Sequence, residues 1–333
     1  MIEPVYIYFI YYLIGMLYCF KIKPNINYFL IFCLLLIWSF ALRSYGLSND
    51  FVTYISTLDL DWYYYYDTYY LREPLYWLSS KFIYENISNN PVYVYFILDT
   101  IFFLFFCMFC KKNKLPEYVF IVFILFFPSI MGFQNVYRQF LATYFILFSI
   151  FNNSEYDKKD LISYFYLLIA FLLHNTAILF LPYIFLKKKK YLLTIMSFVF
   201  LVVAFYFFGD GGRSSSDTGD VNPLVYMLAI SILFLFYLFL NNFKIKYKDN
   251  FFLNSFVLSI GLHVFSIIIM AGGQSKRVGM IILLINLFAL LFFLEKDLRI
   301  KNYNKVIIRL ILFCVLSLIA VLVPSSRDML VGT

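Results

Sequence analysis

The chain has 333 residues, of which 63% are hydrophobic and only 14% are charged. A water-soluble domain of this length cannot bury so much apolar surface, so the composition excludes one and predicts an all-α, polytopic integral membrane protein. The formal net charge of +8 comes from lysines that we expect to contact membrane lipids at the cytoplasmic surface. The basic charge therefore does not indicate nucleic-acid binding.

Apolar runs separated by polar breaks recur along the whole chain and predict one transmembrane domain covering residues 1–333. Each crossing of the hydrocarbon core takes about 20 mostly apolar residues in a helix, and the runs yield about twelve helices. The predicted helices cover residues 5–20, 28–42, 93–110, 118–131, 138–151, 161–173, 176–186, 191–208, 223–240, 251–271, 278–294 and 305–323.

The hairpin of residues 161–186 is the exception, because each of its arms has only about a dozen residues and is too short for a comfortable crossing. It either spans the membrane or re-enters from the cytoplasmic side, and re-entry would leave about ten full spans.

Basic residues set the predicted topology. Alternate loops on one side carry nineteen of the 27 lysines and arginines, so the positive-inside rule makes that side cytoplasmic and places both termini outside. Seventeen of the 19 lysines lie inside, whereas six of the eight arginines lie outside. Lysines therefore account for topology, and the outer arginines indicate another role.

Two segments are predicted to lie outside the membrane. The longer, residues 43–91, contains short helices, one of them starting near Pro74, a residue favoured in the first helical turn. Seven aromatic residues between positions 62 and 70 lie there among three aspartates. They either anchor the chain at headgroup level or form a carbohydrate-binding surface. The second segment, residues 209–222, is rich in glycine and serine and is predicted to be flexible.

No metal site and no cofactor are predicted. Cys107 and Cys110 have CxxC spacing, but they lie in a phenylalanine-rich helix with no second pair of ligands, which favours a packing role. The spacing of Asp210, Asp217 and Asp220 does not match a calcium-binding EF-hand loop and is typical of a solvated segment.

Two outer arginines are candidates for binding a lipid diphosphate. Arg138 opens a predicted helix, and Arg277 stands at the start of another, after a glycine-containing stretch. A guanidinium at such a place can bind phosphate oxygens through two nitrogens while the helix dipole adds attraction. The alternative is that each side chain reaches to outer headgroups. Arg43 and Arg213, also outside, are secondary candidates.

Three further polar residues lie in or near apolar segments. Asp99 falls inside a predicted helix, where a carboxylate is costly, so it either has a catalytic role or pairs with a buried arginine or a tyrosine hydroxyl. His174, at the tip of the short hairpin, is either a proton acceptor or a helix-end cap. His263, in mid-helix, is interpreted as a hydrogen-bonded interior residue.

The order of these elements resembles the EpsG-like branch of the Wzy-type polymerases, which extend O-antigen, capsule or exopolysaccharide chains. The resemblance is strongest from Arg43 to Pro182. The matching stretches are Arg43-Ser44-Tyr45-Gly46 with Asp50 and Tyr54, Glu73-Pro74-Leu75-Tyr76, Tyr137-Arg138-Gln139-Phe140-Leu141-Ala142 and Leu173-His174-Asn175-Thr176-Ala177.

The resemblance implies an enzyme of the bacterial cytoplasmic (inner) membrane that uses no metal. It would transfer a growing glycan from its undecaprenyl-diphosphate carrier to a lipid-linked repeat unit at the outer leaflet. A chain-length regulator and a flippase are the implied protein partners. Asp50, Glu73, Arg138 and His174 are the residues carried over, and the general base is one of Asp50, Glu73 and His174. Arg277 is included because of its predicted topology.

Other functions fit parts of the same pattern. A flippase for lipid-linked oligosaccharide also needs cations for the diphosphate, but it would be expected to show two related halves and little extramembrane structure. No internal repeat is visible here, and the outer segment is long. A membrane glycan ligase and an acyltransferase are the remaining alternatives.

Overall fold

A computed structural model of the protein describes residues 3–21, 27–46, 50–152, 160–208, 222–243, 251–270, 272–297 and 302–331. Every regular element in these ranges is a helix, and none of these residues forms a strand. The predicted all-α class is therefore confirmed. The secondary candidate Arg213 and residues 209–221 of the predicted flexible segment lie outside the described residues.

The helices group into two compact units. Helix α9 (Tyr137–Phe151) belongs to the first unit up to Tyr144 and to the second from Phe145, and residues Leu172–Asn175 return to the first.

The first unit contains α1 (Pro4–Cys19), α2 (Tyr28–Tyr45), α3 (Asp50–Leu58), a 3-10 helix (Trp62–Tyr66), α4 (Thr68–Leu71), α5 (Pro74–Asn86), α6 (Pro91–Lys112), α7 (Tyr118–Leu125), α8 (Phe127–Gln134), α16 (Asn302–Leu322) and α17 (Pro324–Val331). The second contains α10 (Asp160–Leu173) up to Phe171, a 3-10 helix (Asn175–Phe180) from Thr176, α11 (Leu181–Lys187), α12 (Tyr191–Phe208), α13 (Pro223–Leu240), α14 (Phe251–Ile269), α15 (Gly272–Phe292) and a π-helical turn (Phe293–Asp297).

Six of the described helical segments are long and apolar enough to cross a membrane, which supports a multi-pass membrane protein. They are Tyr28–Tyr45, Pro91–Lys112, Pro223–Leu240, Phe251–Ile269, Gly272–Lys296 and Tyr303–Leu322. The count of about twelve spans stays a prediction. So does the path of the 161–186 hairpin, whose arms Leu161–Leu173 and Asn175–Lys187 fall among the shorter apolar helices.

The prediction of one continuous helix over residues 118–131 was wrong. Two eight-residue helices, α7 and α8, replace it, because Phe126 between them has an extended backbone. Pro128 explains the break, since it has no backbone N–H and its ring would clash with the carbonyl of Ile124 in a continuous helix.

Short helices occupy most of the segment that the sequence placed outside the membrane. Helix α5 begins at Pro74, as predicted. The Tyr65 hydroxyl donates to the Thr57 carbonyl at 2.7 Å, and the buried Lys81 ammonium donates to the Leu58 carbonyl at 2.7 Å. These bonds fasten α5 and the 3-10 helix to the end of α3, so this segment is a folded structure instead of a plain linker.

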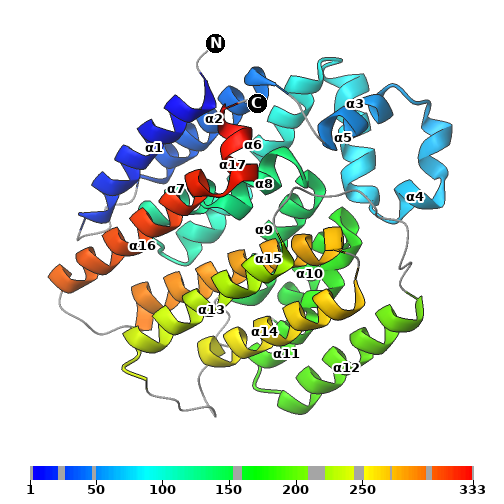
Figure 1. The fold of residues 1–333 in the computed structure, drawn as a ribbon. Helices are drawn as coiled ribbons and strands as arrows, with labels where there is room; N and C mark the ends of the chain where they lie inside the picture. The colour runs from blue at the N-terminus through cyan, green and yellow to red at the C-terminus, as the bar shows by residue number, and fades with distance from the viewer. Residues whose placement is uncertain are drawn as a thin grey trace. The chain divides into compact units, whose positions relative to one another are not determined.

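In the first unit, α1 packs against α7 and α16, and α17 also contacts α1 (Figure 1). Gly15 permits this close approach. A Cβ atom added there would lie 2.2 Å from Phe313 Cζ of α16 and 2.8 Å from Ile121 Cγ2 of α7.

We expect Gly15→Val to destabilise the protein by about 1–3 kcal/mol, because α1 would have to move away from two packed helices. The matched control is Gly261→Val, in α14, where the nearest atom to an added Cβ is 4.0 Å away. Thermal unfolding in detergent, followed by loss of the monodisperse chromatographic peak, measures both. Equal melting temperatures for the two variants would contradict this account of the packing.

Candidate active site

Three of the residues singled out in the sequence meet in the first unit, each at the end of a helix. Glu73 immediately precedes α5, and Arg138 is the second residue of α9. His174 follows the last residue of α10 and precedes a 3-10 helix. The predictions that Arg138 opens a helix and that His174 lies at the tip of a hairpin are confirmed.

The Glu73 carboxylate joins the other two side chains. Its Oε2 forms an ion pair with Arg138 Nη1, and its Oε1 lies 3.2 Å from His174 Nδ1. The backbone N–H of Asn175 also donates to Oε1, at 3.4 Å. Glu73 and His174 are 5% and 8% exposed, so the contacts of the Glu73 carboxylate are little screened by water.

Aromatic rings surround the Arg138 guanidinium. Its central carbon lies 4.8 Å from the centre of the Trp77 ring, 5.4 Å from Tyr54 and 6.0 Å from Tyr76. Burial raises the pKa of Tyr76 well above its usual value, so this phenol stays neutral beside the guanidinium. Arg138 Nε and Trp77 Nε1 are buried donors with no hydrogen-bond partner among the described residues.

Asp50 lies at the border of this cluster. It is the first residue of α3, and the Tyr54 hydroxyl donates to its Oδ2 at 3.3 Å. The Tyr54 ring in turn faces Arg138. Asp50 is therefore linked to the arginine through a tyrosine.

A second buried cluster centres on Asp99 of α6. Arg43 binds its carboxylate through two nitrogens, Nε to Oδ2 at 2.9 Å and Nη2 to Oδ1 at 3.3 Å. Ser39 Oγ donates to Oδ2 and the Tyr137 hydroxyl donates to Oδ1, each at 2.7 Å. The expectation that Asp99 pairs with a buried arginine or a tyrosine hydroxyl is confirmed, and both partners are present.

The placement of Arg43 in an outer loop was wrong. Helix α2 continues to Tyr45, one turn beyond its predicted end, and Arg43 is 2% exposed. Its Nη1 donates to the Phe133 carbonyl at 3.0 Å, and its guanidinium lies 3.9 Å from the Phe133 ring centre and 4.5 Å from that of Phe51. Such a side chain holds the fold together and is enclosed by protein.

Arg277 does not open a helix, contrary to the prediction. Helix α15 starts at Gly272, so Arg277 is its sixth residue, and it belongs to the second unit. His263, also in that unit, is buried as predicted, with Nε2 3.0 Å from the Pro223 carbonyl oxygen. The cluster described above contains neither residue.

The model of the EpsG family matches residues 26–330, nearly the whole chain. The protein belongs to the EpsG family. No curated protein and no solved structure matches it. Family membership indicates a membrane protein of polysaccharide biosynthesis with a glycosyltransferase or polymerase type of activity.

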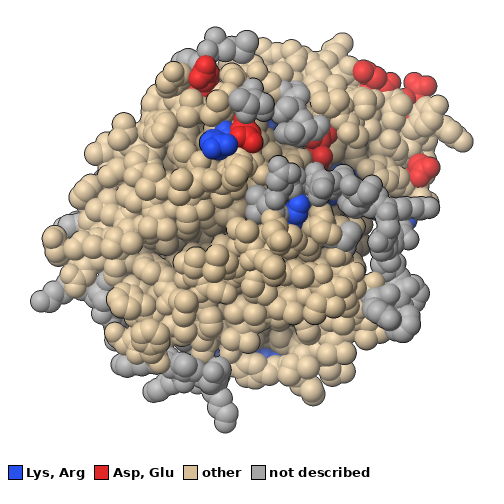
Figure 2. All heavy atoms as spheres, viewed as in Figure 1, with Lys and Arg blue, Asp and Glu red and all other residues tan. Residues whose placement is uncertain are grey.

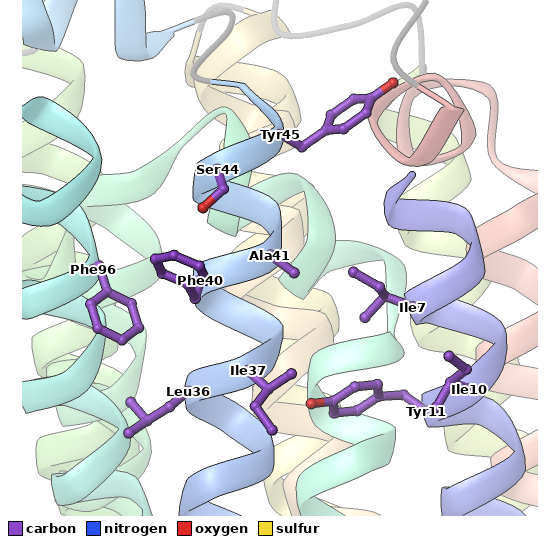
Figure 3. A pocket seen from close by; sticks show the side chains of 10 residues that line it. All are labelled: Ile7, Ile10, Tyr11, Leu36, Ile37, Phe40, Ala41, Ser44, Tyr45 and Phe96. Atoms are coloured by element: carbon purple, nitrogen blue, oxygen red, sulfur yellow. The ribbon is translucent and has the colours of Figure 1, made fainter. Parts of the chain in front are cut away.

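An apolar groove of about 540 Å³ lies elsewhere in the first unit of this EpsG-family protein (Figure 3). Its lining comes from α1, α2 and α6 and includes Ile7, Ile37, Phe40 and Phe96, with the hydroxyl of Tyr45 at one end. None of the residues of the charged cluster lines it. Apart from the side chains of Tyr11, Ser44 and Tyr45, the lining is hydrocarbon, and it includes no charged residue.

The residues that enclose Arg138 and Arg43 have no predicted role from the sequence. Tyr54, Tyr76 and Tyr137 were part of the matching stretches, but their side chains were given no function. The adjacent pair Tyr137-Arg138 could have predicted two separate clusters, because successive residues on a helix point about 100° apart. Trp77, within α5, allowed no such prediction.

We expect Asp99→Ala to destabilise this EpsG-family protein by about 3–5 kcal/mol, because it leaves the Arg43 charge buried without its partner. Replacing both residues, as Arg43→Met with Asp99→Leu, should recover most of that loss. Melting temperatures of the single and double variants in detergent measure the coupling. A double variant no more stable than Asp99→Ala would show that the ion pair is not the source of the effect.

Proposed function

We propose that this protein polymerises a surface polysaccharide at the outer leaflet of the bacterial cytoplasmic membrane. The growing glycan leaves its polyprenyl-diphosphate carrier and is transferred to the terminal sugar of a lipid-linked repeat unit. The observation that supports this proposal is the joining of Arg138, Glu73 and His174 in one partly enclosed cluster. Glycosyl transfer from a diphosphate needs a cation to stabilise the leaving group and a base to take the acceptor's proton, and this cluster contains a guanidinium, a carboxylate and an imidazole.

The reaction breaks the bond between the anomeric carbon and a diphosphate oxygen, and the electron pair leaves with the diphosphate. The acceptor hydroxyl oxygen forms the new bond to the anomeric carbon and gives up its proton. Arg138 stabilises the leaving diphosphate, and its aromatic surroundings strengthen that attraction because they exclude water. The Arg138 side chain is 15% exposed, so part of it is accessible to a phosphate oxygen.

His174 accepts the proton of the acceptor hydroxyl in this proposal, and Glu73 orients it. A hydrogen bond from Nδ1 to the Glu73 carboxylate puts the proton of the neutral imidazole on Nδ1 and the lone pair on Nε2. The same carboxylate stabilises the imidazolium that forms. Asp50 then contributes through Tyr54, which holds one side of the Arg138 pocket.

Binding of a diphosphate would weaken the ion pair between Glu73 and Arg138. A diphosphate carries more negative charge than a carboxylate and competes with Glu73 for the guanidinium. When it binds, Glu73 keeps its contact with His174 and loses part of its cationic partner. The carboxylate then favours a protonated imidazole more strongly, so diphosphate binding makes His174 a better base.

We expect Arg138→Ala to reduce the polysaccharide ladder of the host to single lipid-linked repeat units, as deletion of the gene would. Arg138→Lys should restore it only in part, since lysine lacks the planar fork that binds two phosphate oxygens. The matched control is Arg72→Ala, which removes an exposed arginine next to Glu73. Gel electrophoresis of the polysaccharide, at equal membrane abundance, measures all three.

A full-length ladder from Arg138→Ala would remove Arg138 from the mechanism. If deletion of the gene leaves lipid-linked repeat units on the cytoplasmic side, the protein is a flippase and the polymerase proposal fails.

We expect His174→Gln to lower the rate of glycan transfer by about 10²–10⁴-fold, the usual contribution of a positioned general base. The assay uses purified protein in nanodiscs with lipid-linked repeat units, and it follows chain elongation. His263→Gln is the control, because it alters a buried histidine of the second unit. Equal rates for the two variants, with both folded, would exclude His174 as the base.

A further inference from the structure

The outer segment of the first unit carries a cluster of exposed aromatic side chains, here called the aromatic surface. Its members lie on the 3-10 helix and on α4, and they are Trp62, Tyr63, Tyr64, Tyr66 and Tyr69. Tyr63 is 82% exposed and Tyr66 is 71% exposed. Single exposed rings are common on protein surfaces, whereas five together mark a binding surface or a contact with lipid.

Acidic side chains border the aromatic surface. Asp59, Asp61, Asp67 and Glu85 are exposed, whereas Arg72 is the only exposed basic residue between positions 50 and 90, all of which are described. Figure 2 shows these acidic patches along the edge of the molecule where α3 to α5 lie. The charge opposes binding to anionic lipid headgroups, which attract basic segments.

Hydrogen bonds and ring stacking hold several of these aromatic and acidic side chains in place. The Trp62 indole N–H donates to Glu85, and the Tyr84 hydroxyl donates to Asp59 at 2.6 Å. Beneath the surface, the buried Tyr65 stacks on Tyr70 with ring centres 4.9 Å apart. A surface fixed in this way loses little conformational entropy when a ligand binds.

Ring contacts connect the aromatic surface with the charged cluster. Tyr69 lies 5.9 Å from the Trp77 ring centre and Tyr70 lies 5.0 Å from it. Trp77 is the ring that lies nearest to the Arg138 guanidinium. Trp77 is buried and joins the two clusters through the protein interior, and Tyr69, which is 51% exposed, is the accessible ring on this side of it.

Sugars match this combination of groups. The C–H face of a pyranose ring packs on an aromatic ring, and its hydroxyls donate hydrogen bonds to carboxylates, which only accept. Glu85 is paired with Lys81 at 2.8 Å. Sugars that carry carboxylates would be repelled by Asp59, Asp61 and Asp67, whereas uncharged sugars and amino sugars would not.

We propose that the aromatic surface binds the glycan itself, as a stretch of uncharged or amino sugars next to the reacting end. The inference rests on the proposed polymerase function and adds a substrate class to it. Bound glycan would stay with the protein between successive additions, so the surface would favour long chains.

The test uses the full-length protein in nanodiscs and two probes, the host polysaccharide released from its lipid by mild acid, and oligogalacturonate as an acidic glycan. We expect the native protein to bind the released polysaccharide and to bind oligogalacturonate at least tenfold more weakly. Tyr63→Ala with Tyr66→Ala should weaken binding of the polysaccharide by about tenfold. Tyr63→Phe with Tyr66→Phe should retain most of it, because the rings remain.

The matched control is Tyr93→Ala, which removes an exposed tyrosine at the start of α6, away from the 3-10 helix and α4. Arg138→Ala should keep its affinity for the lipid-free polysaccharide and lose polymerisation. In the host, the double alanine variant should give shorter chains while still joining repeat units.

Unchanged binding by the double alanine variant would overturn the assignment of the surface, as would preferred binding of oligogalacturonate. Loss of membrane abundance with normal binding would show a lipid anchor instead. If the native protein binds the polysaccharide but deletion of its gene leaves the ladder intact, the polymerase proposal fails and the glycan site stands. If deletion collapses the ladder and no binding is found, the polymerase proposal stands and the glycan site fails.

Discussion

The geometry of the charged cluster depends on the carboxylate of Asp99. A carboxylate enclosed among apolar helices is costly unless its oxygens are fully bonded, and here Ser39, Arg43 and Tyr137 supply the bonds. They come from α2 and α9 and converge on α6, so one buried charge fixes three helices. Because Tyr137 is held on α6, the next residue, Arg138, is directed to the neighbouring face of α9, where Glu73 meets it.

Neighbouring residues of one helix therefore serve opposite purposes. Tyr137 completes a closed network, whereas Arg138 lies in a cluster that is partly exposed. The Arg43 guanidinium uses all three nitrogens within the protein, but Arg138 keeps a buried Nε without a partner among the described residues. A permanent ion pair stabilises the fold, and an incompletely satisfied one can bind an anion from outside.

The outcome for each residue shows what a sequence can predict about such a site. The cost of an intramembrane carboxylate was sufficient to predict a buried arginine or a tyrosine hydroxyl beside Asp99, but not which one. Arg43 was overlooked as that partner because basic residues near an apolar run are assigned to loops, although the helix continues around it. The start of α15 was misplaced for a similar reason, since Gly272 weakens helix propensity and tertiary packing prevailed over it. Contacts such as Glu73 with His174, which are 101 positions apart, depend on the tertiary fold and leave no local pattern.

The preference for arginine in the segments predicted to lie outside the membrane has more than one cause. Arg43 and Arg138 each pair with a carboxylate while aromatic rings cover the guanidinium. A lysine ammonium is more strongly hydrated and has no flat face to stack, so it could provide the charge but would lose more on burial among rings. Arg72 and Arg327 are exposed, and there a lysine would satisfy the same surroundings. Stacking on aromatic rings therefore explains the choice of arginine at both positions, and exposure is what separates them: the Arg43 side chain is 2% exposed, whereas the Arg138 side chain is 15% exposed.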